Sequence, residues 1–346
     1  MVPSASLTCT TCRVLNTSDS SLCVNCHRPL LLSAYLVSQT LFQDRYSIID
    51  KLGTGGFGSV YKARDTRCTN TLVAIKEFCL RGLTPQELVE ATSAFNREGD
   101  LLSQLTHPGL PRMYEQIRGL EQWYLVMDFL EGETLENYQN KAQDRRLLLS
   151  EVFTIGLQLC DVLEYLHNHQ PPIVFRDLKP ANIIRAAGGK LYVIDFGIAR
   201  FFKPGQVKDT MALGSLGYAA PEQYGRAQTT PRADIYSLGA ILHQLLTGKD
   251  PSEAPLRFTP LRGKHASSRS DPGGLTSSMV DVMMDRLGML INSMLELEMN
   301  KRPASVTLIK QELHQLAAIW SEIVRGFCRP RIPRMSLSPA LTGSSY

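Results

Sequence analysis

Three short motifs occur in a fixed order along the 346-residue chain, and they constrain its fold more than any other feature. They are Gly53-Thr54-Gly55-Gly56-Phe57-Gly58, then Arg176-Asp177-Leu178-Lys179-Pro180-Ala181-Asn182, and then Asp195-Phe196-Gly197. A fourth segment, Val73-Ala74-Ile75-Lys76, lies between the first and the second. Any one motif could arise by chance, but four in this order indicate a single chemistry carried by a single fold.

The glycine spacing at positions 53, 55 and 58 is shared by two kinds of phosphate-binding segment. A dinucleotide-binding motif should open a helix after its last glycine. Here residues 59–63 alternate polar and apolar side chains, and residues 73–76 follow with a second strand pattern. We therefore expect a hairpin over the phosphates, where Gly53, Gly55 and Gly58 let backbone N–H groups approach.

Lys76 ends an apolar strand, which would place its ammonium group beneath the glycine hairpin, within reach of the α- and β-phosphates. The alternative is an ordinary solvated lysine. Residues 88–105 carry apolar side chains at helical spacing, and Glu98 lies on this helix. We expect Glu98 to hold Lys76, with Glu87 and Glu90 as alternatives.

The second and third motifs supply the other groups that phosphoryl transfer needs. Its transition state spreads charge over several oxygens, so the protein must mainly position the reactants and neutralise this charge. We expect Asp177 to accept the proton of the attacking hydroxyl and Lys179 to contact the transferred phosphate. Asn182 and Asp195 would hold Mg²⁺ (or Mn²⁺). A turn-forming aspartate and a capping asparagine are the alternatives for Asp177 and Asn182.

On these motifs the chain resembles the bacterial, eukaryotic-like serine/threonine protein kinases over residues 46–325. Three further segments agree: Ala220-Pro221-Glu222, Asp234-Ile235-Tyr236-Ser237-Leu238-Gly239 and Lys301-Arg302-Pro303. The resemblance implies an α+β, bilobal protein kinase fold, with a small β-rich lobe that has one main helix and a larger helical lobe. It implies transfer of the ATP γ-phosphate to Ser or Thr of protein substrates, and a buried ion pair between Glu222 and Arg302.

The resemblance also predicts the nucleotide pocket. Residues 123–127 would form a strand that leads into a hinge at 128–130, with Met127 as the gatekeeper. Backbone groups of Asp128 and Leu130 would hydrogen-bond the adenine. The remaining nucleotide-binding side chains expected are Leu52, Val60, Ala74 and Ile184. Plain core packing is the alternative for the apolar members of this set.

The activation segment carries the regulatory residues that the resemblance implies. Thr210 is a candidate site of autophosphorylation, and Arg176 and Arg200 would form the cationic pocket that receives the phosphate. An unmodified Thr210 is the alternative.

Two positions depart from the family pattern without removing the expected contacts. Ser215 stands where threonine is usual, and its hydroxyl can still bond Asp177 and Lys179. Phe175 stands where most relatives have His or Tyr, and we expect it to pack against Phe196.

The first 29 residues contain two C-x-x-C pairs, Cys9 with Cys12 and Cys23 with Cys26. Four thiolates can complete a tetrahedral Zn²⁺ site, and a segment too short for a core needs such a link. The segment resembles a zinc ribbon, although the residues after each pair are not the usual glycines. Disulfides, iron and a redox pair are the alternatives.

Composition and charge exclude several classes of protein. The net charge of +4 is small and scattered, which makes nucleic-acid binding an unfavoured expectation. There is neither a long uncharged apolar run nor a signal-like start, so we expect a cytoplasmic protein without a membrane anchor. The ribbon is expected to serve a protein partner or self-association.

The expected domain organisation follows from these segments. Residues 1–29 are a zinc-ribbon-like segment with four cysteines, 30–44 a linker, 45–326 the kinase domain (lobes 45–129 and 130–326), and 327–346 a disordered tail. Residues 250–278, rich in Pro, Gly, Ser and Arg, predict a surface loop. An active kinase is the leading expectation, ahead of a pseudokinase acting as a nucleotide-gated binding or scaffold module and of a small-molecule kinase.

Overall fold

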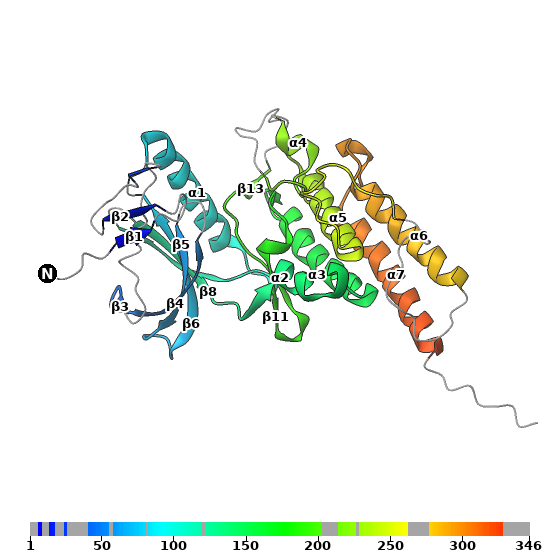
Figure 1. The fold of residues 1–346 in the computed structure, drawn as a ribbon, viewed down its shortest axis with the longest axis horizontal. Helices are drawn as coiled ribbons and strands as arrows, with labels where there is room; N and C mark the ends of the chain where they lie inside the picture. Colours follow the sequence, from blue (N-terminus) through cyan, green and yellow to red (C-terminus); the bar gives the residue numbers. More distant parts are fainter. Residues whose placement is uncertain are drawn as a thin grey trace, which may run out of the picture.

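The structure is a computed structural model, and it describes residues 6–8, 14–17, 24–25, 41–54, 58–80, 82–119, 122–202, 214–225, 228–261 and 277–327. The strands of a large sheet and one long helix form one lobe, and the other helices form a second (Figure 1). The chain passes from the first lobe to the second after strand β8. This arrangement agrees with the bilobal fold expected from the motifs.

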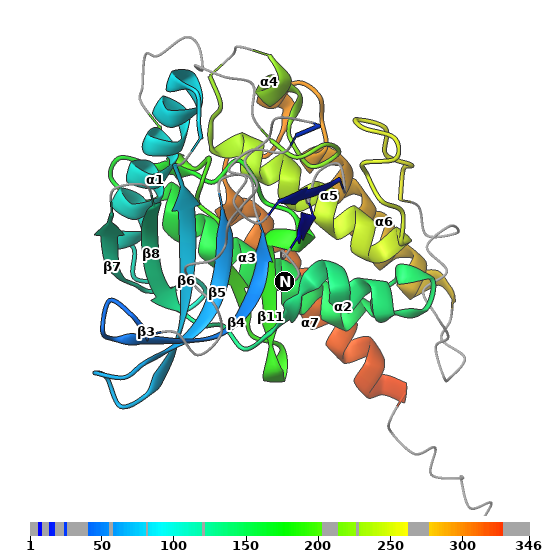
Figure 2. The same cartoon turned by 60° about the vertical axis from the view of Figure 1, so that its left-hand side comes forward.

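The sheet of the first lobe is antiparallel, and Figure 2 shows most of its strands side by side. In spatial order its strands are β3 (Leu41–Phe42), β4 (Tyr46–Thr54), β5 (Ser59–Asp65), β6 (Thr71–Cys79), β8 (Gln122–Asp128) and β7 (Met113–Arg118). Strand β3 lies inside the segment expected to be a linker, and it pairs with β4. The ring of Phe42 packs 4.5 Å from that of Tyr124, which ties this segment to the sheet.

Strands β4 and β5 flank the glycine motif and pair with each other, with Gly53 opposite Val60. The expected hairpin is therefore confirmed, and the helix of a dinucleotide-binding motif is not found. A Cβ atom on Gly58 would lie 2.1 Å from the carbonyl oxygen of Glu77, so only glycine fits this close approach of two backbones. Gly55 lies outside the described residues.

Helix α1 (Pro85–Gln104) packs against the sheet and begins with a complete capping box. The Thr84 side chain accepts a hydrogen bond from the backbone N–H of Glu87, whose carboxylate accepts from the backbone N–H of Thr84. The cap accounts for Glu87, which was one alternative partner of Lys76. The buried face of the helix carries Phe95, Leu102 and Glu98.

The second lobe is built around helix α5 (Pro231–Thr247), which is buried from Ala233 to Leu245. The other helices are α2 (Leu135–Lys141), α3 (Leu149–His167), α4 (Pro221–Tyr224), α6 (Ser277–Met294) and α7 (Val306–Phe327). A three-stranded sheet has the order β12 (Leu191–Val193), β11 (Ile183–Ala186) and β9 (Gly132–Thr134), and β10 (Ile173–Val174) pairs with β13 (Arg200–Phe201). Four 3-10 turns are Gln143–Arg145, Pro180–Asn182, Ala187–Gly189 and Met299–Lys301.

The described part of the expected loop at 250–278 packs on α5 through its apolar side chains. The ring of Phe258 contacts those of Tyr236 and His243, and His243 Nε2 lies 2.9 Å from the carbonyl oxygen of Thr259. Leu261 is buried as well. This stretch is a surface loop, as expected, and its apolar side chains cover the helix. Residues 262–276 lie outside the described ranges.

Near the N-terminus, β1 (Ser6–Thr8) and β2 (Leu15–Thr17) pair as an antiparallel hairpin. Asn16 is buried, and its side-chain oxygen accepts a hydrogen bond of 2.8 Å from the backbone N–H of Val24. The four cysteines expected to bind metal, Cys9, Cys12, Cys23 and Cys26, lie outside the described residues. Among the helices described, none has the length and apolar character needed to cross a membrane.

Candidate active site

Lys76, Glu98 and Asp195 meet where the two lobes face each other. Lys76 Nζ lies 2.8 and 2.7 Å from the two carboxylate oxygens of Glu98, and 2.9 Å from Oδ1 of Asp195. The partner chosen from the sequence is therefore the one found. Glu90, the other alternative, accepts a hydrogen bond from Gln86 instead.

Electrostatics keeps Lys76 and Asp195 charged. Burial alone would favour the neutral amine, but the two carboxylates outweigh it and raise the pKa of Lys76 above its ordinary value. Burial also opposes ionisation of Asp195, yet Lys76 holds the pKa of that carboxyl below its ordinary value. The arrangement thus presents one fixed ammonium group and one ionised carboxylate between the two lobes.

The carboxylate of Asp177 is held from several sides. Asn182 Nδ2 donates to Oδ2 of Asp177 at 2.9 Å and to its backbone carbonyl at 3.0 Å. Ser215 Oγ donates to Oδ1 at 2.6 Å, and Lys179 Nζ lies 3.0 Å from Oδ2. Lys179 also donates to Ser215 at 2.6 Å, as the sequence predicted. The loop therefore fixes a carboxylate, an ammonium group and an amide within one small volume.

The residues present fit a magnesium ion. Because the amide nitrogen of Asn182 faces Asp177, its side-chain oxygen is the atom left to face a cation. Asp195 uses Oδ1 for Lys76 and for the Gly197 N–H, which leaves Oδ2 as a second oxygen ligand. Mg²⁺ prefers this type of donor, with water and phosphate oxygens completing its shell.

A buried carboxylate on α5 holds the backbone of the loop that carries Asp177. Asp234 is fully buried and accepts backbone N–H bonds from Phe175 at 2.9 Å and Arg176 at 2.8 Å. His167 Nε2 lies 2.9 Å from the same carboxylate. The ring of Phe175 meets that of Phe196 edge-on at 5.1 Å, as expected. The loop is thus anchored to the most deeply buried helix of the lobe.

The strand register gathers the expected nucleotide-binding residues. Ala74 is opposite Met127 across the β6–β8 pair, and Val60 is opposite Lys76 across β5–β6. The N–H of Asp128 donates to the Arg112 carbonyl at 2.9 Å, so the group that Asp128 can offer an adenine is its carbonyl. Leu130 and Ile184 are half-buried here, whereas Leu52 is largely exposed at the edge.

After a gap, the structure describes the activation segment from Gly214 onwards. Arg302 donates to both carboxylate oxygens of Glu222 at 2.7 and 2.8 Å, and its side chain is fully buried, which confirms the expected ion pair. Thr210 lies outside the described residues. Arg200 follows the third motif on β13, and Arg176 follows Phe175 on the catalytic loop.

Arg97 is a residue that reasoning from the sequence missed. It precedes Glu98 on α1 and donates to the carbonyl of Gly197 at 3.1 Å, so it joins the helix to the third motif. Burial and the nearby Arg200 lower the pKa of Arg97. Its adjacency to Glu98 on α1 was the one signal that the sequence offered.

Comparison with known proteins agrees with this geometry. The protein kinase domain family matches residues 46–314. The chain belongs to this family. The probable serine/threonine-protein kinase PknB of Lactococcus lactis is 36% identical over 212 residues, which cover 61% of this chain and 33% of that protein. PrkC of Bacillus subtilis is 35% identical over 208 residues, covering 60% and 31%.

A third relative, serine/threonine-protein kinase C of Synechocystis, is 36% identical over 221 residues, covering 61% of this chain and 40% of that protein. The chain therefore spans about a third of the length of these curated relatives. What they share with it is the kinase domain, and the activity of the whole protein is a separate question.

Proposed function

We propose that this chain is an active serine/threonine protein kinase, which transfers the γ-phosphate of ATP to hydroxyl groups of protein substrates. The observation that carries the proposal is the contact of Lys76 Nζ with both Glu98 and Asp195, at 2.7 to 2.9 Å. This contact joins β6, α1 and the third motif through one ammonium group. The names of the relatives from Lactococcus, Bacillus and Synechocystis support the choice of Ser and Thr as acceptors.

Each side chain has a role that its position supports. Lys76 binds the α- and β-phosphates, and Glu98 keeps its ammonium group in place. Asp177 accepts the proton of the attacking hydroxyl, while Lys179 stabilises charge on the transferred phosphate. Asn182 and Asp195 hold Mg²⁺, which neutralises phosphate charge when it is bound. Adenine sits between Ala74 and Ile184.

Transfer of labelled phosphate from ATP tests the proposal. The chain and a generic basic protein serve as acceptors, beside the variants Lys76→Met and Asp195→Ala. We expect label on Ser or Thr that both substitutions abolish. Binding of ATP without transfer in the parent chain would contradict the proposal and favour the pseudokinase, a nucleotide-gated binding or scaffold module.

We further propose that Thr210 is autophosphorylated and that Arg176 and Arg200 receive its phosphate. The support is the position of Arg200 on β13, paired with the strand that leads into Arg176. Mass spectrometry after incubation with ATP and Mg²⁺ tests this directly. Phosphate found elsewhere in the segment 195–222, or nowhere in it, would contradict the assignment.

We also propose that residues 1–29 bind one Zn²⁺ through Cys9, Cys12, Cys23 and Cys26, and that this ribbon contacts a protein partner or a second copy. The support is that the first cysteine pair falls between paired strands β1 and β2, and that Asn16 bonds Val24 inside the second pair. One zinc per chain by elemental analysis, lost in Cys12→Ser, is the expected result. A zinc-free protein whose four cysteines are oxidised would contradict it.

A further inference from the structure

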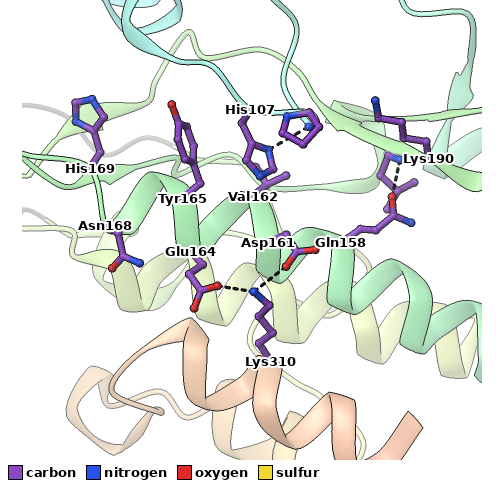
Figure 3. Close-up of a pocket in the computed structure, with 13 residues that line it drawn as sticks. His107, Gln158, Asp161, Val162, Glu164, Tyr165, Asn168, His169, Lys190 and Lys310 are labelled. Carbon is purple, nitrogen blue, oxygen red and sulfur yellow. Dashed lines mark hydrogen bonds and ion pairs between the residues drawn. The ribbon is translucent and has the colours of Figure 1, made fainter. Parts of the chain in front are cut away.

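A groove of about 580 Å³ lies on the helical lobe, and none of its lining residues belongs to the candidate active site. Its floor is the face of α3 that carries Gln158, Asp161 and Tyr165, followed by Asn168 and His169 just after the helix (Figure 3). The loop between α1 and β7 and the turn between β11 and β12 form one wall, and Lys310 of α7 closes the other side. The volume is that of a typical small-molecule site.

The polar side chains of the groove stand in two rows. Figure 3 shows His169, Tyr165, His107 and Lys190 along one row, and Asn168, Glu164, Asp161 and Lys310 along the other. The first row contains one cation, two imidazoles and a phenol, but no carboxylate. The groove therefore has a side that can donate hydrogen bonds.

The contacts of His107 fix which of its nitrogens faces a ligand. Its Nδ1 accepts a hydrogen bond of 3.0 Å from the backbone N–H of Gly109, and burial lowers its pKa. The ring is thus neutral near pH 7 and carries its proton on Nε2. Tyr165 stacks on it at 5.0 Å and accepts from the Thr106 N–H at 2.9 Å, so the phenol hydrogen is left to donate.

The two carboxylates of the groove share one ammonium group, which leaves their row with a net charge of −1. Lys310 lies 2.8 Å from Asp161 and 2.5 Å from Glu164. Gln158 is also occupied, since it donates to the Gly189 carbonyl and accepts from the Leu191 N–H. The charge of the other row is the ammonium group of Lys190, which is exposed.

We propose that this groove binds a small organic dianion, a phosphate monoester or a dicarboxylate. Lys190 supplies the charge, while His107 Nε2–H, Tyr165 O–H and the side chain of Asn168 supply hydrogen bonds. Hydrogen bonds between charged donors and anionic oxygens are the strong ones, and buried Val162 and Leu191 give the carbon skeleton an apolar surface.

A backbone hydrogen bond joins the wall of the groove to the strand that leads to Asp195. The carbonyl of Gly109 accepts a hydrogen bond of 2.9 Å from Val193, two residues before Asp195. The same loop follows α1, which carries Glu98. A dianion bound by His107 and Tyr165 would therefore order the loop after α1 and its hydrogen bond to β12. Because α1 carries Glu98 and β12 leads to Asp195, the ligand would regulate the candidate active site.

Calorimetric titration tests the site on the full chain, with the nucleotide pocket saturated by a non-hydrolysable ATP analogue and Mg²⁺. The probes are inorganic phosphate, glycerol 2-phosphate and succinate, which separate phosphate from carboxylate recognition. We expect saturable binding of at least one probe, and Lys190→Met should weaken it about tenfold. Lys249→Met, an exposed lysine outside the groove, is the matched control.

Two substitutions at His107 separate ligand binding from loop structure. Asn places an acceptor near the position of Nδ1 and keeps the Gly109 bond, but it lacks the Nε2 donor. Gln places an amide near Nε2 but loses the acceptor for Gly109. We expect His107→Asn to weaken binding more than His107→Gln. Absence of binding by all three probes, or equal affinity in the parent and Lys190→Met, would overturn the proposal, and neither outcome depends on kinase activity.

Discussion

Ser215 and Asp177 share a hydrogen bond of 2.6 Å, with the serine hydroxyl donating to Oδ1 of the carboxylate. The bond joins the activation segment to the proposed catalytic base. A residue that differs from the usual threonine of the family therefore keeps the same contact. The position of this segment and the orientation of the base are consequently linked.

The first prediction concerns this bond. Ser215→Ala should lower kcat by about ten- to a hundredfold, because a hydrogen bond to a charged group contributes about 1.5–3 kcal/mol. Ser215→Thr should retain activity, since it restores the hydroxyl. Steady-state kinetics on one protein substrate checks both variants. Equal rates for Ser215→Ala and the parent would show that the bond does not position Asp177.

The second prediction separates two glutamates on one helix. Glu98→Gln should lower kcat/KM for ATP by about ten- to a hundredfold, because Lys76 loses the charged partner that fixes it. Glu90→Gln is the matched control, and it should behave as the parent, since Glu90 contacts Gln86 on the surface. A similar loss in both variants would point to a general effect on α1.

A third prediction concerns stability. Arg302→Met should destabilise the fold by about 3–5 kcal/mol, because it leaves Glu222 as a buried charge without its partner. Lys301→Met, next in the chain, breaks only an exposed pair with Glu298 and should leave the urea midpoint unchanged. The double variant Glu222→Gln, Arg302→Met should recover part of the loss. No recovery would mean that packing around Arg302 outweighs its charge.

The fourth prediction is a pH dependence. Burial lowers the pKa of His243 below its usual 6.5, so near and below that pH the unfolded chain binds a proton that the folded chain does not. This contribution to stability is present above pH 6.5 and is lost as the pH falls towards the folded-state pKa. His243→Gln should reduce the slope of unfolding free energy between pH 5 and 7, by at most about 1.4 kcal/mol per pH unit.

His314→Gln, at an exposed position on α7, is the control for this measurement. Its pH profile should follow that of the parent. An unchanged slope in His243→Gln would show that protonation elsewhere, for example at His107, dominates the acid sensitivity.

Lys76, Asp177, Asn182 and Asp195 could be predicted from the sequence because each belongs to a short motif. The pairing of Lys76 with Glu98 needed one more step, namely the helical spacing of residues 88–105. The ion pair between Glu222 and Arg302 followed only from the family resemblance. Local pattern and resemblance were together sufficient for these residues.

Other features depend on packing between segments far apart in the chain. The groove is lined by His107, Tyr165, Lys190 and Lys310, which share no motif and come from two helices, a loop and a turn. The packing of Phe258 against α5 was missed because the composition around it, rich in Pro, Gly and Ser, is also typical of solvated loops. Strand β3 has only two residues, too few for a period to be seen.

We propose that Asp177 is the base in a site whose other residues bind ATP and Mg²⁺. Single-turnover transfer from ATP to a protein substrate, measured beside nucleotide affinity in the parent and Asp177→Asn, tests this claim most directly. We expect unchanged affinity for ATP·Mg²⁺ and a transfer rate lowered by orders of magnitude in Asp177→Asn. Equal transfer rates in the two proteins would contradict it.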